Sequence, residues 1–452
     1  MRPSLFAPVA LVVGVWGCAG VAPDINTAAI VVQSEIRALL DAGEITVALA
    51  RATSYERRSP GPESWSLLGR ALWRSGELLE AESFYRRAAS AGSTEGTLGL
   101  ARAAAALGRF DEARSLAEQL AADERTHPEA LRVLAAVAWR RGNSVLAAEH
   151  LSAAAEASRD AALRARLSTA AAAAATMPQN SDGPVILWRG SAGTVPLERD
   201  STGAPIVVVQ MGGVAARLRL SLLSPRSTLS PELVGRVGLV VHGDSAGGGH
   251  AVAPVELGGV EATAVPFVLQ PLDGAEGELG FDVISTLDWE LWLSDDRMVV
   301  RPPHAGLPAG IGNPGPGEFL ERPMHWVDVR VPVDGLDAQL LLLPRLSSVA
   351  VAAGIDLWGP SRISEGGLAR ATVHLAESVD QQPDGVVSLV TRLGGFGARV
   401  AYRLESSRDA LAGSTSVVPQ AVLGAEFAHA WGLRWSSERR QLSLIVLDAS
   451  AR

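Results

Sequence analysis

Apolar and polar residues follow two different periods along this chain, and the change of period divides it. From residue 27 to 176, apolar positions, many of them alanine, recur at the spacing of amphipathic helices. Beyond residue 203 the apolar runs are short and are separated by glycine pairs, which is typical of β-hairpins. The pattern therefore predicts an all-α N-terminal part and an all-β C-terminal part.

Turn-forming residues mark the boundaries between the parts. Residues 177–202 are rich in Asn, Asp, Ser and Gly, which predicts a linker. A second turn-rich stretch, residues 302–323, contains six prolines and divides the β part into a first lobe, 203–301, and a second lobe, 324–447. Because few contacts usually cross such a linker, we expect the helical part and the β part to fold separately.

The helical part contains an internal repeat. Glycines recur at intervals of 33, 32 and 34 residues, and alanines recur at the same three intervals: Gly43, Gly76, Gly108 and Gly142, with Ala48, Ala81, Ala113 and Ala147. Each glycine is expected in the turn of a helical hairpin, and each small alanine where two helices cross closely. The spacing predicts about four stacked hairpins.

The best copy of this repeat resembles the tetratricopeptide family. The match to its pattern, with a leucine in place of one aromatic residue, consists of Trp65, Leu68, Gly69, Ala81 and Tyr85. The resemblance implies a curved solenoid whose concave face binds an extended peptide or another protein, and which carries no chemistry of its own. The alternative is that the array packs against the C-terminal part as a spacer.

Residues 1–18 resemble the export signal and lipobox of a bacterial lipoprotein. Arg2 and the apolar residues 5–15 are followed by Trp16, Gly17 and Cys18, and the apolar stretch is too short to span a bilayer. The resemblance implies acylation of Cys18 and attachment to a membrane surface. We expect a location in the cell envelope, anchored at the periplasmic face of the bacterial outer membrane or otherwise periplasmic. The alternative is an ordinary signal peptide with an incidental cysteine.

Length, charge and cysteine content narrow the range of functions. At 452 residues the chain is too long for one ordinary core, and with a net charge of -9 it shows no basic patch that would indicate nucleic-acid binding. The single cysteine excludes an intramolecular disulfide and a thiolate cluster. The eight histidines have no metal-ligand spacing, so we expect neither a metal nor another cofactor.

The two β lobes resemble each other and, together, the pepsin and retropepsin family of aspartic proteases. Residues 207–220 and 329–342 each have the pattern of a strand, a glycine-containing turn and a second strand. Gly280 and Gly424 match the glycine of the loop that closes the family's catalytic site, and residues 248–269 resemble its flap hairpin. The resemblance implies a two-lobed fold with a cleft between the lobes.

In that family, hydrolysis requires one carboxylate from each lobe, and the two share a proton. The family spacing places these acids at Ser221 in the first lobe and Leu343 in the second, and shifting the second count reaches only Leu341 or Leu342. No Asp-Thr-Gly or Asp-Ser-Gly occurs in the chain. The resemblance therefore implies a degenerate protease domain with no catalytic residues, and we expect no peptide hydrolysis.

Other candidate groups have simpler explanations. Asp282 follows a closing-loop glycine and is expected to be structural, and three aspartates fall in predicted turns: Asp244, Asp334 and Asp337. Residues 243–247 match the G-x-S-x-G elbow of serine hydrolases, with Ser245 as nucleophile and His242 and His250 nearby. An elbow must lead into a helix, which the glycines at 247–249 disfavour, so a glycine-rich loop is preferred.

The sequence thus predicts a lipid-anchored scaffold that binds a protein or peptide and carries a non-catalytic, protease-like domain. The alternative is an active aspartic endopeptidase whose acids lie at unrecognised positions. A structure that brings two carboxylates together at the lobe interface would favour this alternative. A serine hydrolase would require Ser245 beside a histidine and an acid.

Overall fold

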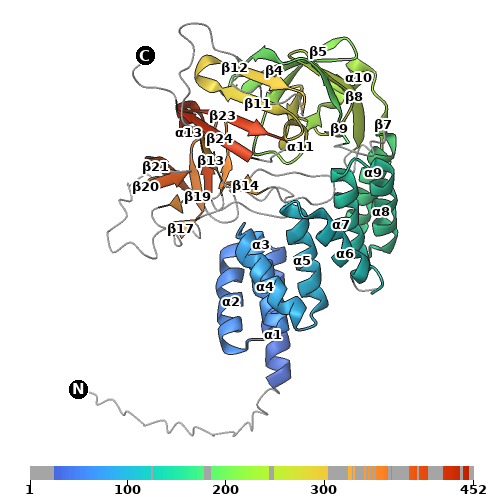
Figure 1. The fold of residues 1–452 in the computed structure, drawn as a ribbon, viewed down its shortest axis with the longest axis vertical. Helices are drawn as coiled ribbons and strands as arrows, with labels where there is room; N and C mark the ends of the chain where they lie inside the picture. The colour runs from blue at the N-terminus through green and yellow to red at the C-terminus, as the bar shows by residue number, and fades with distance from the viewer. Residues whose placement is uncertain are drawn as a thin grey trace, which may run out of the picture.

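The computed structural model describes residues 25–123, 126–177, 185–243 and 249–303 without interruption, together with shorter segments of the second lobe: 324–327, 329–330, 341–342, 345–346, 349–350, 353–364, 368, 386–393, 396–405, 421–437 and 441–446. Figure 1 shows a curved array of helices whose last members lie beside a β domain.

Within the described residues, four antiparallel helical hairpins and one further helix form the array. They are α1 (Ile25–Asp41), α2 (Ile45–Arg58), α3 (Pro62–Arg74), α4 (Leu78–Ser90), α5 (Thr94–Ala106), α6 (Phe110–Leu120), α7 (His127–Arg140), α8 (Ser144–Ala157) and α9 (Ala161–Thr176). The four repeat glycines lie in the hairpin turns with φ between +78° and +84°, a conformation that favours glycine. The four repeat alanines are 0% exposed. The predicted repeat is therefore confirmed.

The first lobe is a nine-stranded sheet with two short helices. Its members are β1 (Trp188–Gly190), β3 (Glu198–Arg199), β4 (Pro205–Met211), β5 (Val214–Leu220), β6 (Thr228–Leu229), α10 (Pro231–Val237), β7 (Val241–His242), β8 (His250–Leu257), β9 (Val260–Leu269), β10 (Gly277–Leu279) and α11 (Phe281–Ile284). Buried and exposed residues alternate along much of β4 and β8, as expected when one face of a strand packs on a core.

The described segments of the second lobe also form a sheet, with nine strands. It contains β14 (Val329–Arg330), β15 (Leu341–Leu342), β16 (Arg345–Leu346), β17 (Val349–Ala350), β18 (Ala353–Ile355), β19 (Arg362–Ser364), β20 (Val386–Leu393), β21 (Phe396–Glu405), β22 (Ala421–Leu423) and the helix α13 (Ala425–Ala430).

A six-stranded sheet joins the two lobes. It contains β2 (Gly193–Pro196), β11 (Asp288–Trp292), β12 (Arg297–Arg301), β13 (Met324–Val327), β23 (Trp431–Ser436) and β24 (Gln441–Val446), with the 3-10 turn η1 (Leu293–Asp295) between β11 and β12. The hairpin β11–β12 of the first lobe meets the hairpin β23–β24 of the second through the antiparallel pair β11 and β23.

The strand pairing repeats from one lobe to the other. In the first lobe, β10 runs parallel to β5 and antiparallel to β6, and β6 runs parallel to β9. In the second lobe, β22 runs parallel to β18 and antiparallel to β19, and β19 runs parallel to β21. This correspondence supports a two-lobed architecture, and the predicted fold class, an all-α array followed by a bilobal β domain, is confirmed.

The segment expected to be a linker, residues 177–202, is largely part of the β domain. Its strands β1, β2 and β3 pair with β9, β12 and β4. Val185 and Ile186 before them are buried. The polar composition misled the prediction because these short strands lie at sheet edges, where burial is partial and polar residues are tolerated.

Helix α9 packs directly on the first lobe, beside β7 and β8 (Figure 1). A methyl group built on Gly243, at the end of β7, would lie 2.6 Å from Cγ2 of Thr169 in α9. A single apolar cluster runs from α5–α9 into both lobes, whereas the repeats α1–α4 share a second cluster with one face of α5. The helical part and the β part are therefore joined by a packed interface.

Candidate functional site

The catalytic positions implied by the protease resemblance follow from the strand register. In the first lobe Leu220 of β5 pairs with Leu279 of β10, and in the second lobe Ile355 of β18 pairs with Leu423 of β22. Ser221 follows Leu220 in the first lobe, and Asp356 follows Ile355 in the second. Ser221 donates its backbone N–H to the Leu279 carbonyl at 3.0 Å, and Asp356 donates its N–H to the Leu423 carbonyl at 2.8 Å. Ser221 and Asp356 therefore occupy equivalent positions.

The predicted position Leu343 lies outside the described residues. The strand register puts Asp356 at the position where Leu343 was expected. The reason is that β18, which ends directly before Asp356, is the strand that runs parallel to β22. Strands β16 and β17 come between β15 and β18 in the chain, so a count that starts from the first hairpin of the lobe stops too early. The second lobe thus carries an acid that counting along the sequence missed.

The closing-loop glycines are placed alike in the two lobes. Gly280 donates its N–H to the hydroxyl of Ser227, and Gly424 donates its N–H to the hydroxyl of Ser361, each at 2.8 Å. A methyl group on Gly280 would lie 2.5 Å from the Arg226 carbonyl oxygen, and one on Gly424 would meet the backbone of Pro360 and Ser361. Both positions require glycine because a loop passes directly over each of them: residues 221–227 over Gly280 and residues 356–361 over Gly424.

An acid follows each closing glycine by two residues and has a structural role. Ser227 donates its hydroxyl to Oδ1 of Asp282 at 2.7 Å, and Ser361 donates its backbone N–H to Oε1 of Glu426 at 3.1 Å. These bonds tie each closing helix to the loop above it. The structural role expected for Asp282 agrees with these contacts.

The Asp356 carboxylate is buried and surrounded by donors. Its Oδ1 accepts the backbone N–H groups of Trp358 and Gly359 at 3.2 and 3.0 Å, and its Oδ2 accepts Nη2 of Arg362 at 2.9 Å. The side chain is 9% exposed. In the first lobe, the Ser221 hydroxyl takes the equivalent place and accepts the backbone N–H of Ser224 at 3.0 Å. Ser221 thus replaces the acid as a cap for the loop backbone, but it supplies no charge.

A second acid, Glu278 of β10, lies beside Ser221. The hydroxyl groups of Ser221 and Ser224 lie near its carboxyl group. Burial raises the pKa of Glu278, the serine hydroxyls and the positive charge of Arg219 lower it, and the negative charge of Asp356 raises it. The net effect is a raised pKa. Among these causes, the charge of Asp356 in the other lobe has the smallest effect on the pKa of Glu278.

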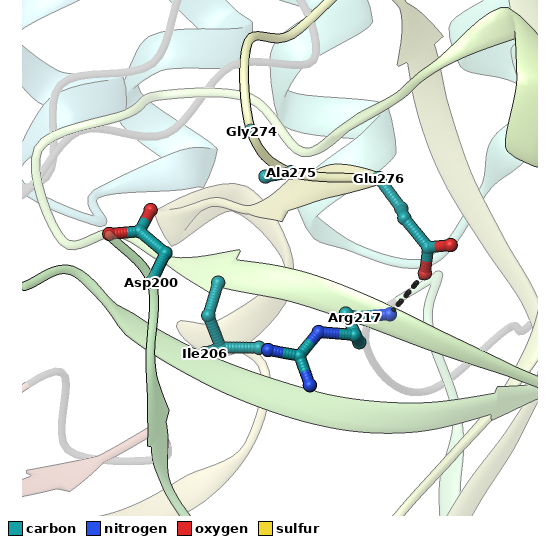
Figure 2. Close-up of a pocket in the computed structure, with 6 residues that line it drawn as sticks. All are labelled: Asp200, Ile206, Arg217, Gly274, Ala275 and Glu276. Atoms are coloured by element: carbon teal, nitrogen blue, oxygen red, sulfur yellow. Dashed lines mark hydrogen bonds between the residues drawn. The ribbon is translucent and has the colours of Figure 1, made fainter. Parts of the chain in front are cut away.

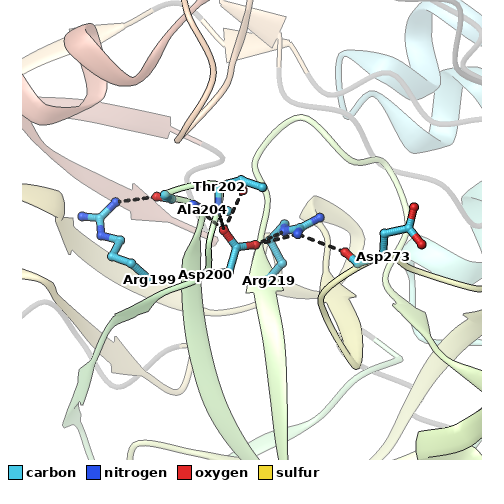
Figure 3. Close-up of polar contacts among 7 residues, drawn as sticks. Arg199, Asp200, Thr202, Ala204, Arg219 and Asp273 are labelled. Atoms are coloured by element: carbon cyan, nitrogen blue, oxygen red, sulfur yellow. Dashed lines mark hydrogen bonds and ion pairs between the residues drawn. The ribbon is translucent and has the colours of Figure 1, made fainter.

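Arg219 contacts both lobes, and Figure 3 shows its guanidinium beside the carboxylate of Asp200. Its guanidinium binds Oδ2 of Asp200 at 2.6 Å and lies 5.6 Å above the ring of Trp358 in the second lobe. Asp200 also accepts the N–H and hydroxyl of Thr202 and the N–H of Ala204. These hydrogen bonds outweigh the effect of burial and hold the pKa of Asp200 well below its usual range. Arg219 is thus fixed from the first lobe while it contacts the second.

A surface cavity of about 320 Å³ opens on the first lobe, near Asp200 (Figure 2). Its charged groups are already paired within the protein: Glu276 with Arg236 and with the backbone N–H of Arg217, and the Arg217 guanidinium with Glu198. The cavity is lined by Asp200, Ile206, Arg217, Gly274, Ala275 and Glu276. We assign no ligand to it because these pairs satisfy its charged groups.

The other candidate residues from the sequence do not form a catalytic site in the described part of the chain. Ser245 and Asp244 lie outside the described residues, as do Asp334, Asp337 and Cys18. His242 and His250 face each other on the antiparallel strands β7 and β8, so the G-x-S-x-G segment joins two strands and does not lead from a strand into a helix. The turn at Gly258 and Gly259 packs against the segment 190–195 and Val300, so this end of the predicted flap does not cover a cleft.

Two classes of site find no support in the part of the chain that the structure describes. There, no three His, Cys, Asp or Glu side chains are grouped so that they could hold a metal ion. None of the helices described combines the length and apolar composition needed to cross a bilayer.

The tetratricopeptide signature residues meet between α3 and α4. Tyr85 is buried, and its ring lies against the backbone of Gly69 in α3 and Gly99 in α5. Leu68 and Ala81 are buried beside it. Trp65 donates its indole N–H to Glu56 at 3.3 Å, and the guanidinium of Arg87 lies 4.5 Å above its ring. These residues hold successive hairpins together and form no exposed site.

Ion pairs connect the first helices of different hairpins. Arg70 of α3 pairs with Asp41 of α1 at 2.8 Å, and Arg37 of α1 pairs with Glu95 of α5 at 3.4 Å. Arg102 of α5 pairs with Glu129 of α7. The arginines are more than one third exposed. The face formed by α1, α3, α5 and α7 is therefore a charged surface with both signs.

Comparisons with known proteins agree with this description. Two family models described as tetratricopeptide repeat match residues 34–95 and 72–137. No match is found among the curated proteins. Solved structures that resemble the chain include an aspartic proteinase from Irpex lacteus, with 11% identity and a TM-score of 0.36, covering 58% of this chain and 100% of that one.

Two seed globulins are also similar. Conglutin gamma from lupine has 10% identity and a TM-score of 0.35, covering 58% of this chain and 97% of its own. Basic 7S globulin from soybean has 11% identity and a TM-score of 0.35, covering 57% and 96%. The helical part thus carries tetratricopeptide repeats, and a β-rich domain follows them.

Proposed function

We propose that this chain is a lipid-anchored scaffold protein of the bacterial cell envelope, located at the periplasmic face of the outer membrane or otherwise periplasmic. Its tetratricopeptide repeats bind a protein or an extended peptide. Its two-lobed β domain does not hydrolyse peptides. The lipid anchor is attached to Cys18.

The observation that supports a non-catalytic domain is the difference between two equivalent positions, which hold a serine, Ser221, in the first lobe and an acid, Asp356, in the second. An aspartic protease needs two coupled carboxylates with access to a water molecule between them. Here the first-lobe position holds a hydroxyl. The second-lobe carboxylate is occupied by Arg362 and two backbone N–H groups. Neither group is available to take a proton from water, so general-base catalysis at these positions is not supported.

Peptide hydrolysis tests this assignment directly. The purified full chain is incubated with a mixed peptide library between pH 3 and 8, and the products are identified by mass spectrometry. We expect no cleavage above that of a blank purified in parallel. Cleavage that disappears in Asp356→Asn would contradict the proposal.

One observation favours a second candidate function, an aspartic-type hydrolase with a rearranged acid pair. Glu278 has a raised pKa and is affected by the charge of Asp356 across the lobe interface. A carboxyl group with a raised pKa keeps its proton to a higher pH and is suited to act as a proton donor. This candidate predicts cleavage that is lost in both Glu278→Gln and Asp356→Asn, with Glu261→Gln, an exposed residue on β9, as the control.

The binding function depends on the charged face of α1, α3, α5 and α7. The full chain is immobilised and used to capture proteins from envelope extract, and Arg102→Glu is compared with Arg114→Glu on α6. A genuine partner of this face should be retained by wild type and Arg114→Glu but lost from Arg102→Glu. Equal retention by all three proteins would contradict the assignment of this face.

Anchoring is tested by cell fractionation. Cys18→Ala should move the protein from the membrane fraction to the soluble periplasmic fraction, because the acyl chains supply the binding energy. Mass spectrometry of the wild-type N-terminus should show a diacylated cysteine. An unchanged distribution of the variant would contradict lipid anchoring at Cys18.

A further inference from the structure

The free end of the first hairpin combines exposed apolar residues with exposed basic residues. Helices α1 and α2 are antiparallel: Gln33 donates to the hydroxyl of Tyr55 at 2.9 Å, and Arg51 pairs with Glu35 at 3.3 Å. These contacts place residues 30 and 31 of α1 level with the last turn of α2. That turn contains Arg57 and Arg58. We call the surface formed by Ile30, Val31, Arg57 and Arg58 the hairpin tip.

Both apolar residues of the hairpin tip are unusually exposed. Ile30 is 64% exposed and Val31 is 58% exposed. Their neighbours Ile36 and Leu40, on the inner side of α1, are buried in the array. Exposed apolar residues beside basic ones are the combination that an amphipathic helix presents to a membrane surface.

The charge of the hairpin is also polarised. Arg57 and Arg58 are exposed at the hairpin tip, whereas the acidic residues Asp41 and Glu44 lie at the opposite end, around the turn between α1 and α2. An anionic surface would therefore attract the hairpin tip and repel the opposite end.

The chain arrives at the hairpin tip from its N-terminal segment. Helix α1 begins at Ile25, seven residues after Cys18. Seven residues can span at most about 25 Å. A lipid anchor on Cys18 would therefore hold the beginning of α1 within about 25 Å of the membrane surface.

We propose that the hairpin tip docks on an anionic lipid surface, with Arg57 and Arg58 among the headgroups and Ile30 and Val31 at the acyl boundary. This proposal deepens the proposed lipid anchoring and rests on it for its location in the cell. Docking would orient the array so that α1 lies at the membrane and the β domain at the far end of the array (Figure 1).

Vesicle binding tests the docking surface without the anchor. Cys18→Ala protein, which cannot be acylated, is sedimented with vesicles of phosphatidylcholine alone or with phosphatidylglycerol added. We expect binding only to the anionic vesicles, and weaker binding at higher salt because ions screen the attraction. In that background, Arg57→Gln with Arg58→Gln should weaken binding by roughly tenfold or more. Ile30→Ser with Val31→Ser should also weaken it.

Matched controls come from the other end of the array. Arg159→Gln with Arg166→Gln removes two exposed arginines there, and Val145→Ser with Leu146→Ser removes two exposed apolar residues, 39% and 37% exposed. Both control pairs should bind like the parent. Equal loss in controls and hairpin-tip variants, or equal binding to neutral and anionic vesicles, would overturn the proposal.

The single cysteine of the chain allows a direct readout of contact. In the Cys18→Ala background, Val31→Cys labelled with an environment-sensitive dye should shift to the blue on addition of anionic vesicles, and labelled Val145→Cys should not. A shift at residue 31 with increasing protein concentration and no vesicles would assign the hairpin tip to self-association instead. Because the protein is not acylated, these outcomes do not depend on whether Cys18 is the anchor.

Discussion

At the residue scale, the closing-loop glycines are the positions where the smallest change should have the largest effect. Gly280→Ala and Gly424→Ala introduce a methyl group into the backbone of the loop above. We expect each to lower the free energy of unfolding by about 1 to 3 kcal/mol. Gly235→Ala is the matched control, because this exposed glycine in α10 has open space around it. The control should be neutral or stabilising by up to about 1 kcal/mol.

Urea denaturation of the three variants checks this prediction. Equal stability of Gly424→Ala and Gly235→Ala would mean that the second-lobe loop can move aside. The same comparison for Gly280→Ala tests the first lobe separately.

Glu278 should give the protein a distinctive dependence on pH. A group whose pKa is raised on folding stabilises the fold below its unfolded pKa, and this contribution is lost as the pH rises through the folded value. Burial raises the pKa of Glu278 above its ordinary value of 4.5. Relative to Glu278→Gln, the wild type should therefore lose stability as the pH rises from about 4.5 into the range above it.

Thermal unfolding of the wild type and of Glu278→Gln between pH 4 and 8 measures this difference in stability. Asp200 and Glu276 have lowered pKa values, so their contributions are lost as the pH falls, but they are present in both proteins and cancel in the difference. Glu261→Gln should show no such trend relative to wild type. A pH-independent difference between wild type and Glu278→Gln would contradict the raised pKa.

At the scale of elements, the six-stranded sheet joins the lobes through a buried charge cluster. Glu290 of β11 binds Arg301 of β12 at 3.1 Å and Arg434 of β23 at 2.7 Å. Trp289 and Trp435 face each other across the same strand pair and are both 1% exposed. Glu290 therefore neutralises one arginine from each lobe in a largely apolar sheet.

Glu290→Gln should destabilise the protein by about 3 to 5 kcal/mol, because it removes the carboxylate charge that the guanidinium groups of Arg301 and Arg434 both bind. Chemical denaturation monitored by tryptophan fluorescence measures this loss. The exposed substitution Glu261→Gln should change stability by less than about 0.5 kcal/mol. A loss as small as that of the control would show that water replaces the carboxylate.

At the scale of the whole molecule, the last helix of the array depends on the β domain. Helix α9 contains six consecutive alanines, Ala170 to Ala175, and Ala171, Ala173 and Ala174 among them are buried. It is covered by α8 and by strands β7 and β8. The β domain therefore serves as the C-terminal cap of the repeats, and we expect the later repeats to unfold with it.

Gly243→Ala tests this coupling. Gly243 and Gly203 both have positive φ, of 89° and 87°, but only Gly243 lies against α9, while Gly203 has open space around it. The backbone penalty should be similar for the two alanine variants, so the excess loss in Gly243→Ala, about 1 to 3 kcal/mol, measures packing against α9. Hydrogen exchange in α9 should accelerate in Gly243→Ala and not in Gly203→Ala. Equal exchange in the two variants would contradict the coupling.

Much of the architecture could be predicted from the sequence because it depends on local patterns. The turns at Gly43, Gly76, Gly108 and Gly142 follow from a conformation that favours glycine, and the helices between them follow from apolar periodicity. The repeat turns and helices are properties of short segments, so the order of residues alone determines them. The closing glycines Gly280 and Gly424 were recognised only through the family resemblance, because the loop that requires them is distant in sequence.

Only the tertiary structure decided what lies at the lobe interface. Asp356 takes the position equivalent to Ser221 because β18 pairs with β22, a strand 68 residues further along the chain. Glu278 meets the charge of Asp356 only when the lobes come together. Likewise, residues 188–199 become strands through partners in β4, β9 and β12. Strand register and contacts between lobes depend on packing over long sequence distances, and no local pattern of residues encodes them.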